Sequence, residues 1–338
     1  DIVSGAEGIT GFITEVTLEV EENRDPVPTM VSFNSLKSLS RFLEAIGSDD
    51  LPIWHMGISN SNYLVNQGRA KGTAEVPGGE YFALIAYPAR SESKVQSTIN
   101  ELASKSEGTV LSRDFAEEEW EDRFYPLRMK QLGPSLVPSE GIIPLESLTS
   151  VVEELEGKYP ELALEGHFAG TDELTLLTFM LTDERAPTYT FDFSKSLSVL
   201  KTIVEHGGKP YSTGLYLTGK AEKLLGEERV KGFRNYKRKY DPNELFNPGK
   251  LIPSKTSLLD LGMKVAEKTE PAVESAGKLF SDRPSEGKEL PAELNYDAFS
   301  CVNCGYCRDV CSLFDGRGWE SSSPRGKFNF LRDYVRGR

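Results

Sequence analysis

All four cysteines of the chain lie between positions 301 and 311, with a spacing typical of a metal site. They are Cys301, Cys304, Cys307 and Cys311, in the pattern C-x2-C-x2-C-x3-C. Thiolates in this spacing bind a [4Fe–4S] cluster. Zinc is the alternative, but zinc sites usually pair two C-x2-C units across a spacer, and four such close ligands would crowd one tetrahedral ion. The spacing therefore favours iron and sulfide, and predicts that this segment transfers electrons.

The ligand set of this cysteine run leaves two interpretations open. Where two clusters share such runs, the first three cysteines hold one cluster and the fourth binds the other. No cysteine follows Cys311 before Arg338, and Ser312 stands where proline is usual. Either Cys311 turns back to complete one cluster, or further ligands lie on another segment or a partner chain.

Composition and charge exclude several classes of protein. The 338 residues are enough for two or three domains, and 38% hydrophobic with 27% charged residues predicts a packed core. A net charge of -13 and a pI near 5.0 argue against nucleic acid and anionic membranes as partners. No apolar run reaches about 18 residues, and no secretion signal opens the sequence. Cysteines confined to a metal-type run favour a reducing, cytoplasmic setting.

Strand and helix patterns alternate between residues 28 and 255, which predicts an α+β domain: an antiparallel sheet with covering helices. Strands are expected at 29–33, 81–87, near 110, 162–168 and 174–181. Helices are expected at 36–46, 93–104, 145–155 and 193–206, with Ser35 as the first N-cap and Gly207 ending the last. Alternating β-branched residues predict one more strand at 12–20.

The first residues resemble a flavin-binding motif. Residues 5–15 read G-A-E-G-I-T-G-F-I-T-E, similar to the G-S-E-G-T-L-G-x-I-T-E motif that closes the FAD-binding domain of the FAD-linked oxidase family. That family includes D-lactate dehydrogenases and the flavoprotein subunit of glycolate oxidase. The resemblance implies that residues 1–20 are the tail of a flavin domain whose larger part precedes Asp1. It also implies cofactor contacts, largely through backbone, at Glu7, Gly8, Ile9, Gly11 and Ile13.

A second stretch resembles the end of the same family's substrate domain. Residues 241–251 read D-P-N-E-L-F-N-P-G-K-L, similar to the family's D-P-x-x-x-x-N-P-G-K signature. Asp-Pro starts a turn and Asn-Pro-Gly makes another. The resemblance implies that this end returns to the flavin, with Asn247 at the cofactor. It implies a substrate domain over residues 21–252, followed by a linker at 253–297 with short helices at 257–268 and 271–280.

The residues after the cysteine run also resemble a known segment. Residues 320–327 read E-S-S-S-P-R-G-K, like the E-x-x-x-P-R-G-K segment of glycolate oxidase iron–sulfur subunits and related fused dehydrogenases. The resemblance implies that residues 298–338 begin an incomplete α-helical ferredoxin-type domain, with a helix starting at Ser323-Pro324.

The chemistry of that family is only partly retained here. Its α-hydroxyacid dehydrogenases carry H-x-G-D-G-N-x-H and G-E-H-G stretches that supply a divalent metal site and a base. Residues 166–172 keep a single histidine, His167, and Ser212-Thr213-Gly214-Leu215 replaces the acid and the base. One imidazole makes a poor metal site. Ordinary metal-assisted oxidation of a 2-hydroxy acid is therefore not expected.

Three residues remain as catalytic candidates, each with a structural alternative. His167 is a proton acceptor or a strand-end histidine. Arg128, with Arg123 nearby, clamps a carboxylate or lies on the surface. Tyr211 is an acid or base, or packs against its neighbours. Two other histidines are interpreted structurally: His55 as core or rim, and His206 as a helix-end residue.

Together these patterns predict part of a flavin- and iron–sulfur-dependent dehydrogenase. It would oxidise a small organic acid, such as a 2-hydroxy acid, with FAD, and pass electrons through a [4Fe–4S] cluster to a further iron–sulfur or acceptor protein. The alternative is a non-catalytic electron-transfer or scaffold subunit whose FAD-binding domain lies on another chain.

Overall fold

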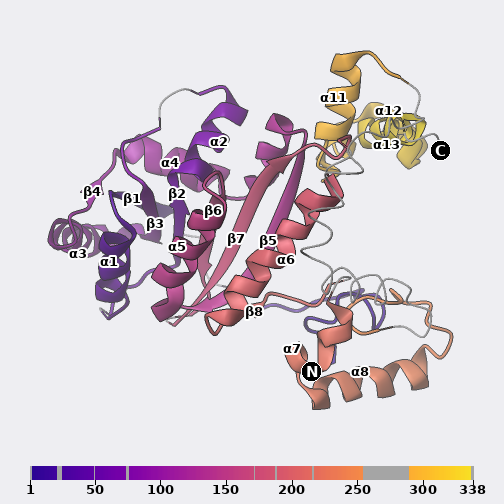
Figure 1. Cartoon of the computed structure of the whole chain (residues 1–338), viewed down its shortest axis with the longest axis horizontal. Coiled ribbons are helices and arrows are strands. Elements are labelled where there is room, and N and C mark those ends of the chain that lie inside the picture. Colours follow the sequence, from indigo (N-terminus) through magenta and orange to yellow (C-terminus); the bar gives the residue numbers. More distant parts are fainter. Residues whose placement is uncertain are drawn as a thin grey trace.

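The computed structural model describes residues 2–20, 25–48, 50–73, 76–170, 172–186, 189–214, 217–253 and 289–335. Within them, the centre is an antiparallel sheet of eight strands in the order β4-β1-β3-β2-β6-β7-β5-β8 (Figure 1). The strands are β1 (Pro26–Phe33), β2 (His55–Asn60), β3 (Tyr81–Pro88), β4 (Thr109–Val110), β5 (Ser135–Pro144), β6 (Ala163–Phe168), β7 (Glu173–Thr182) and β8 (Lys209–Pro210). The expected antiparallel sheet is confirmed.

The sheet is built from two units with the same chain path. The first runs β1, α1 (Leu36–Ser48), β2, α2 (Ser61–Lys71), β3, α3 (Glu92–Lys105), β4, and the second runs β5, α5 (Leu148–Lys158), β6, β7, α6 (Tyr189–Glu205), β8. Apart from α2, each is a β-α-β-β-α-β arrangement. They meet edge to edge where β2 pairs with β6, a junction that we call the central seam. The sequence patterns did not predict β2 or this internal repeat.

One face of the sheet carries the main hydrophobic core under α1, α3, α5 and α6. Leu39, Phe42 and Leu43 of α1 are fully buried there, as the helical spacing predicted. The hydroxyl of Ser35 accepts the N–H of Ser38 at 3.1 Å, which confirms the expected N-cap. Burial of this face fixes the strand register, because a slip of one residue would turn the apolar side chains outward.

The other face is only partly covered, by α2 (Ser61–Lys71), α4 (Arg113–Asp122) and the 3-10 helix η2 (Pro126–Leu132). A smaller core lies beneath them and includes Tyr63, Phe82, Met129 and Phe179. Glu140 of β5 points to the same side and is exposed. This face is therefore packed at the α2 end and open toward the opposite strand ends.

A separate small core joins the first residues to the segment after the sheet. Ile9 packs with Val230 and Phe233, where α8 (Glu227–Tyr240) follows the short α7 (Ala221–Leu225). The buried Lys237 forms an ion pair with Asp241 at 2.6 Å and donates to the carbonyl of Ile9 at 3.3 Å. The opening and closing motifs, separate in sequence, thus lie together at the lower right of Figure 1.

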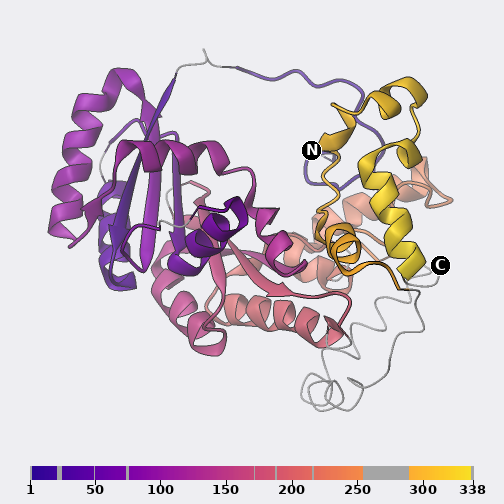
Figure 2. The ribbon, with the colours of Figure 1, turned by 90° about the horizontal axis from the view of Figure 1, so that it is seen from above.

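The strand expected at 12–20 is wrong. Residues 12–20 are extended but belong to no strand of the described chain, and Phe12, Leu18 and Val20 are exposed. Figure 2 shows this segment crossing outside the sheet toward the chain start. The β-branched alternation was present, but a strand also needs a neighbour to take its backbone hydrogen bonds.

The C-terminal unit is helical. It contains α11 (Ala292–Ser300), α12 (Ser312–Arg317) and α13 (Pro324–Val335), and the buried Arg332 of α13 donates to the carbonyl of Ala298 at 2.6 Å. The helix predicted from Pro324 is confirmed, whereas the linker helices expected at 257–268 and 271–280 lie outside the described residues. None of the described helices has the length and apolarity to cross a membrane.

Candidate active site

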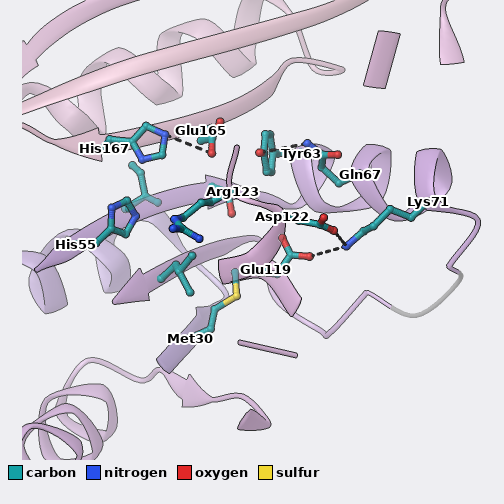
Figure 3. Close-up of a pocket in the computed structure, with 14 residues that line it drawn as sticks. Met30, His55, Tyr63, Gln67, Lys71, Glu119, Asp122, Arg123, Glu165 and His167 are labelled. Carbon is teal, nitrogen blue, oxygen red and sulfur yellow. Dashed lines mark hydrogen bonds and ion pairs between the residues drawn. The ribbon is translucent and has the colours of Figure 1, made fainter. Parts of the chain in front are cut away.

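A small polar cavity lies at the central seam, on the partly covered face. Its volume is about 30 Å³, room for one or two water-sized groups. β2 and β6 form its floor, and α2 and α4 its walls. Figure 3 shows His55, Arg123 and His167 directed into the same space. The lining residues are Met30, His55, Gly57, Ile58, Ser59, Tyr63, Gln67, Lys71, Leu84, Glu119, Asp122, Arg123, Glu165 and His167.

Two histidines face each other across this floor. The ring centroids of His55 and His167 are 5.5 Å apart, and His55 also meets the ring of Trp120 edge-on at 5.4 Å. Burial, the His167 ring and the Arg123 guanidinium together lower the pKa of His55 to about 4. His55 is therefore neutral at physiological pH.

Arg123 brings an unneutralised positive charge to the cavity. Its guanidinium lies 3.7 Å above the Trp120 ring and donates to the Trp120 carbonyl. Burial lowers its pKa, and no carboxylate pairs with it in the part of the chain that the structure describes. A guanidinium with free donors in a half-buried place is suited to an anionic ligand.

Two buried acceptor oxygens in the cavity lack a donor. Glu165 is 6% exposed and Gln67 is 5% exposed, and neither Oε2 of Glu165 nor Oε1 of Gln67 has a hydrogen-bond partner within the described ranges. Leaving a buried acceptor unpaired costs about 1–3 kcal/mol. These oxygens therefore favour a bound group that brings N–H or O–H donors.

The wall beside α2 is an ion-pair cluster. Lys71 lies 2.8 Å from Glu118, 3.2 Å from Glu119 and 2.9 Å from Asp122. Burial opposes the charge of Lys71, but its hydrogen bonds to Glu118 and Asp122 raise its pKa overall. One lysine faces three carboxylates here, so the cluster has no spare positive charge, and the positive charge available to a ligand comes from Arg123.

The predicted catalytic residues are not all brought together. His167 lines the cavity. Arg128 does not, because both its terminal nitrogens donate to Asp122 at 3.0 Å. Tyr211 follows β8, is 56% exposed and lies outside the cavity lining. His206 meets Glu154 at 2.8 Å on the opposite, helix-covered face. Of the two arginines considered, the geometry favours Arg123.

The predicted cofactor residues form a tight turn closed by the second motif. Glu7, Gly8 and Asn247 all have positive φ, and the Asn247 side chain donates to the Glu7 carbonyl at 2.6 Å. Ile9 is 1% exposed and belongs to the core, whereas Ile13 is 65% exposed. A neighbouring hollow of about 310 Å³ is lined by cationic and turn residues including Lys250. Strained turns with accessible backbone and a cationic border fit an anionic cofactor such as FAD. These contacts stay predictions.

The four cysteines are free thiols with a donor chemistry that fits an iron–sulfur cluster. Asn303 and Gly305 between them have positive φ, and Arg325 donates to the Asn303 carbonyl at 3.1 Å. Nevertheless, no group of three or more His, Cys, Asp or Glu side chains in the described ranges is arranged to hold a metal ion. The cluster therefore stays a prediction from spacing.

The cysteine unit contacts η2, the segment beside the cavity wall, directly. Lys130 of η2 donates to the Cys301 carbonyl at 3.1 Å, and the Tyr296 hydroxyl donates to the Gln131 carbonyl. Because η2 follows Arg123 by only three residues, the cysteine unit and the cavity share one supporting segment.

Comparison with known proteins assigns the family. Residues 24–251 match the family "FAD linked oxidases, C-terminal domain". The chain belongs to this family. It is 24% identical over 273 residues to the mitochondrial D-lactate dehydrogenase (cytochrome) of Arabidopsis thaliana, covering 75% of this chain and 47% of that protein. The chain thus spans about half the length of the curated relative.

Solved structures show the same fold. 4-Ethylphenol oxidase from Gulosibacter chungangensis, in complex with isoeugenol, has a TM-score of 0.52 at 14% identity over 69% of this chain and 55% of that one. p-Cresol methylhydroxylase with substrate bound has a TM-score of 0.50 at 15% identity over 69% of this chain and 54% of the other. At these identities the likeness concerns the fold alone.

His55 and Glu165 are the residues whose place in the site the sequence patterns did not reveal. His55 was interpreted as core or rim because β2 was not recognised. Glu165 alternates with the apolar Leu164 and precedes His167 by two residues, so period-two reading of β6 places Glu165 and His167 on one face. This two-residue spacing is the sequence signal that places Glu165 beside His167.

Proposed function

We propose that the chain is the substrate and electron-exit part of a dehydrogenase that oxidises a small organic acid, such as a 2-hydroxy acid, with FAD. Electrons would leave through a [4Fe–4S] cluster on Cys301, Cys304, Cys307 and Cys311. The observation that carries the proposal is the cavity at the central seam. It combines the unneutralised Arg123 with imidazoles and with acceptor oxygens that lack donors.

The substrate class follows from these groups. A carboxylate satisfies the donors of Arg123. A hydroxyl offers one proton, which an imidazole of the cavity can accept. The small cavity volume favours a ligand whose reacting end has few atoms.

The chain's own residues bind the anion, hold the proton and support the exit segment. When bound, a flavin supplies a two-electron acceptor and an iron–sulfur cluster supplies a one-electron carrier. The turn at Glu7, Gly8 and Asn247 would contact the flavin through backbone. The Lys130 contact keeps the cysteine unit against η2, next to the cavity wall, so substrate binding and electron exit would be neighbours.

A quantitative assay of iron, acid-labile sulfide and FAD on anaerobically purified protein tests the proposal. About four iron and four sulfide per chain, with bleaching of flavin absorbance when glycolate or D-lactate is added, would support it. Zinc in place of iron would contradict the electron-exit role.

The same assay distinguishes the proposed dehydrogenase from the alternative, a non-catalytic electron-transfer or scaffold subunit. Iron and sulfide without FAD, and no reduction by any 2-hydroxy acid when an FAD-binding partner is present, would favour an electron-transfer subunit. This alternative is kept because Thr213 and Gly214 stand where the family's G-E-H-G stretch has its acid and its base.

A further inference from the structure

The imidazole rings of His55 and His167 both border the space above Gly57, which has no side chain. A Cβ atom on Gly57 would lie 3.0 Å from Nε2 of His55, 3.2 Å from the Gly166 carbonyl oxygen and 3.4 Å from Nδ1 of His167. Gly57 pairs with His167 across the central seam. The two ring nitrogens therefore border the same small volume above Gly57, which any other residue at that position would fill.

The second nitrogen of His167 lies next to a carboxylate. Nε2 of His167 lies 3.3 Å from Oε1 of Glu165, and the two residues stand on one face of β6, two positions apart. A carboxylate at Nε2 favours the tautomer with its proton there, which leaves the Nδ1 lone pair directed at the space above Gly57.

We propose that Glu165, His167 and His55 form one proton-handling chain, in which the substrate hydroxyl binds above Gly57 between Nδ1 of His167 and Nε2 of His55. His167 is the proton acceptor, His55 stays neutral and donates a hydrogen bond to the substrate oxygen, and Glu165 is a positioning residue. This inference deepens the proposed function and rests on it for the substrate class. It assigns roles to His55 and Glu165.

The step balances with a flavin as the two-electron oxidant. The substrate O–H bond breaks and its proton passes to Nδ1 of His167. A bound flavin would supply the acceptor for the hydrogen of the adjacent C–H bond and both of its electrons. The carbon–oxygen bond becomes double, so a 2-hydroxy acid yields a 2-oxo acid. The imidazolium formed on His167 is stabilised by the Glu165 carboxylate.

The charges around His55 suit a donor that must stay neutral. From α4 it faces Arg123, from β6 it faces His167 and Glu165, and the more distant wall carries Glu119, Asp122, Lys71 and Tyr63. Arg123 and His167 both lower the pKa of His55. When His167 has taken up a proton, the positive charges of His167 and Arg123 together oppose protonation of His55.

Nitrogen-15 NMR of the histidine rings tests the chain without any turnover. The protein has only three histidines, and His206, which pairs with Glu154, gives a remote reference signal. At pH 7.5 we expect His167 in the Nε2–H tautomer. Glu165→Gln, which retains an acceptor oxygen, should preserve that tautomer, and Glu165→Leu should lose it. An Nδ1–H tautomer in the wild type would overturn the proposal.

Removing one ring tests the coupling between the two. His167→Gln should raise the pKa of His55 from about 4, because one of its causes is removed. His206→Gln is the matched control and should leave the His55 titration unchanged. An unchanged His55 titration in His167→Gln would contradict a shared proton site.

Ligand titration separates this inference from the proposed function. Glycolate should shift both ring signals, whereas acetate, which has no hydroxyl, should not. Gly57→Ala should weaken the glycolate response at least ~10-fold because a Cβ atom occupies the space, and Gly47→Ala, with open space around it, should not. A Gly57→Ala variant that responds like the wild type overturns the inference. Correct tautomers without any glycolate response contradict the proposed substrate class instead.

Discussion

Asn60, at the end of β2, accepts the backbone N–H of Leu164 in β6 through its side-chain oxygen at 3.0 Å. The same oxygen accepts the N–H of Tyr63 at 3.1 Å and so caps α2. The side-chain amide donates to the Leu162 carbonyl at 2.8 Å. One buried residue thus ties together the two units of the sheet and the helix that forms a wall of the cavity.

Replacement of Asn60 should be costly for stability. Asn60→Ala leaves the Leu164 N–H and the Leu162 carbonyl without these partners and removes the helix cap, so we expect a loss of about 2–4 kcal/mol in the free energy of unfolding. Urea denaturation measures it. Asn62→Ala, which removes only exposed or part-buried hydrogen bonds to the same region, is the control. Equal losses in both variants would contradict the role given to Asn60.

Arg123 should control affinity for carboxylates. Arg123→Met keeps an unbranched side chain but removes the charge, so we expect glycolate to bind about 10- to 100-fold more weakly, as for loss of a charged hydrogen bond. Isothermal titration calorimetry measures this. Arg113→Met, at an exposed pair with Glu92, is the control. A comparable loss in Arg128→Met, with Arg123→Met unaffected, would reverse the assignment.

His55 should make stability depend on pH in a defined window. Its folded-state pKa of about 4 lies below the unfolded value of about 6.5, so between these values the unfolded chain binds more protons. The contribution is therefore complete above about pH 6.5 and is lost as the pH falls toward 4. After allowance for solvent screening we expect about 1–2 kcal/mol.

Urea denaturation at several pH values measures this contribution as a difference between the wild type and His55→Gln. The wild type should lose more stability than the variant on going from pH 7 to pH 4.5. Parallel pH profiles for the two proteins would show that His55 is not held neutral by its surroundings.

The fold could largely be predicted from the sequence, and the site only in part. The apolar spacing of Leu39, Phe42 and Leu43 located α1 because a buried helix face needs that period. His55 escaped because β2 is short, and Met56 and Ile58 alone supply its apolar alternation. Pairing of β2 with β6 is a long-range contact, and local pattern cannot supply it. The strand predicted at 12–20 was wrong for the opposite reason. Its residues alternate as in a strand, but no strand of the described chain pairs with them.

The cysteine run should depend on each thiolate. Cys304→Ser should remove visible absorbance near about 400 nm and lower the iron content below about four per chain. Ser312→Ala, next to the run but without a ligand atom removed, is the comparison and should keep both. Unchanged absorbance in Cys304→Ser would count against the cluster.

Lys130 should hold the cysteine unit in place. Lys130→Met removes the donor to the Cys301 carbonyl, and we expect local opening of α11 to become easier by about 1 kcal/mol, because the contact is charged but only half-buried. Hydrogen exchange of the α11 amides reports this. Lys105→Met, at an exposed pair with Glu101, should leave α11 exchange unaltered, and identical exchange in both variants would exclude a docking role for Lys130.

The cavity lining comes almost wholly from strands and helices, and its floor is a hydrogen-bonded ladder. Hydrogen-bonded backbone of this kind opens only when much of the domain unfolds, and that is far slower than the movement of a loop. The histidines and Arg123 are therefore a fixed template rather than a moving lid. Movement of this backbone is then too slow to time the entry and exit of a ligand, and the domain's contribution is to fix the geometry of the site.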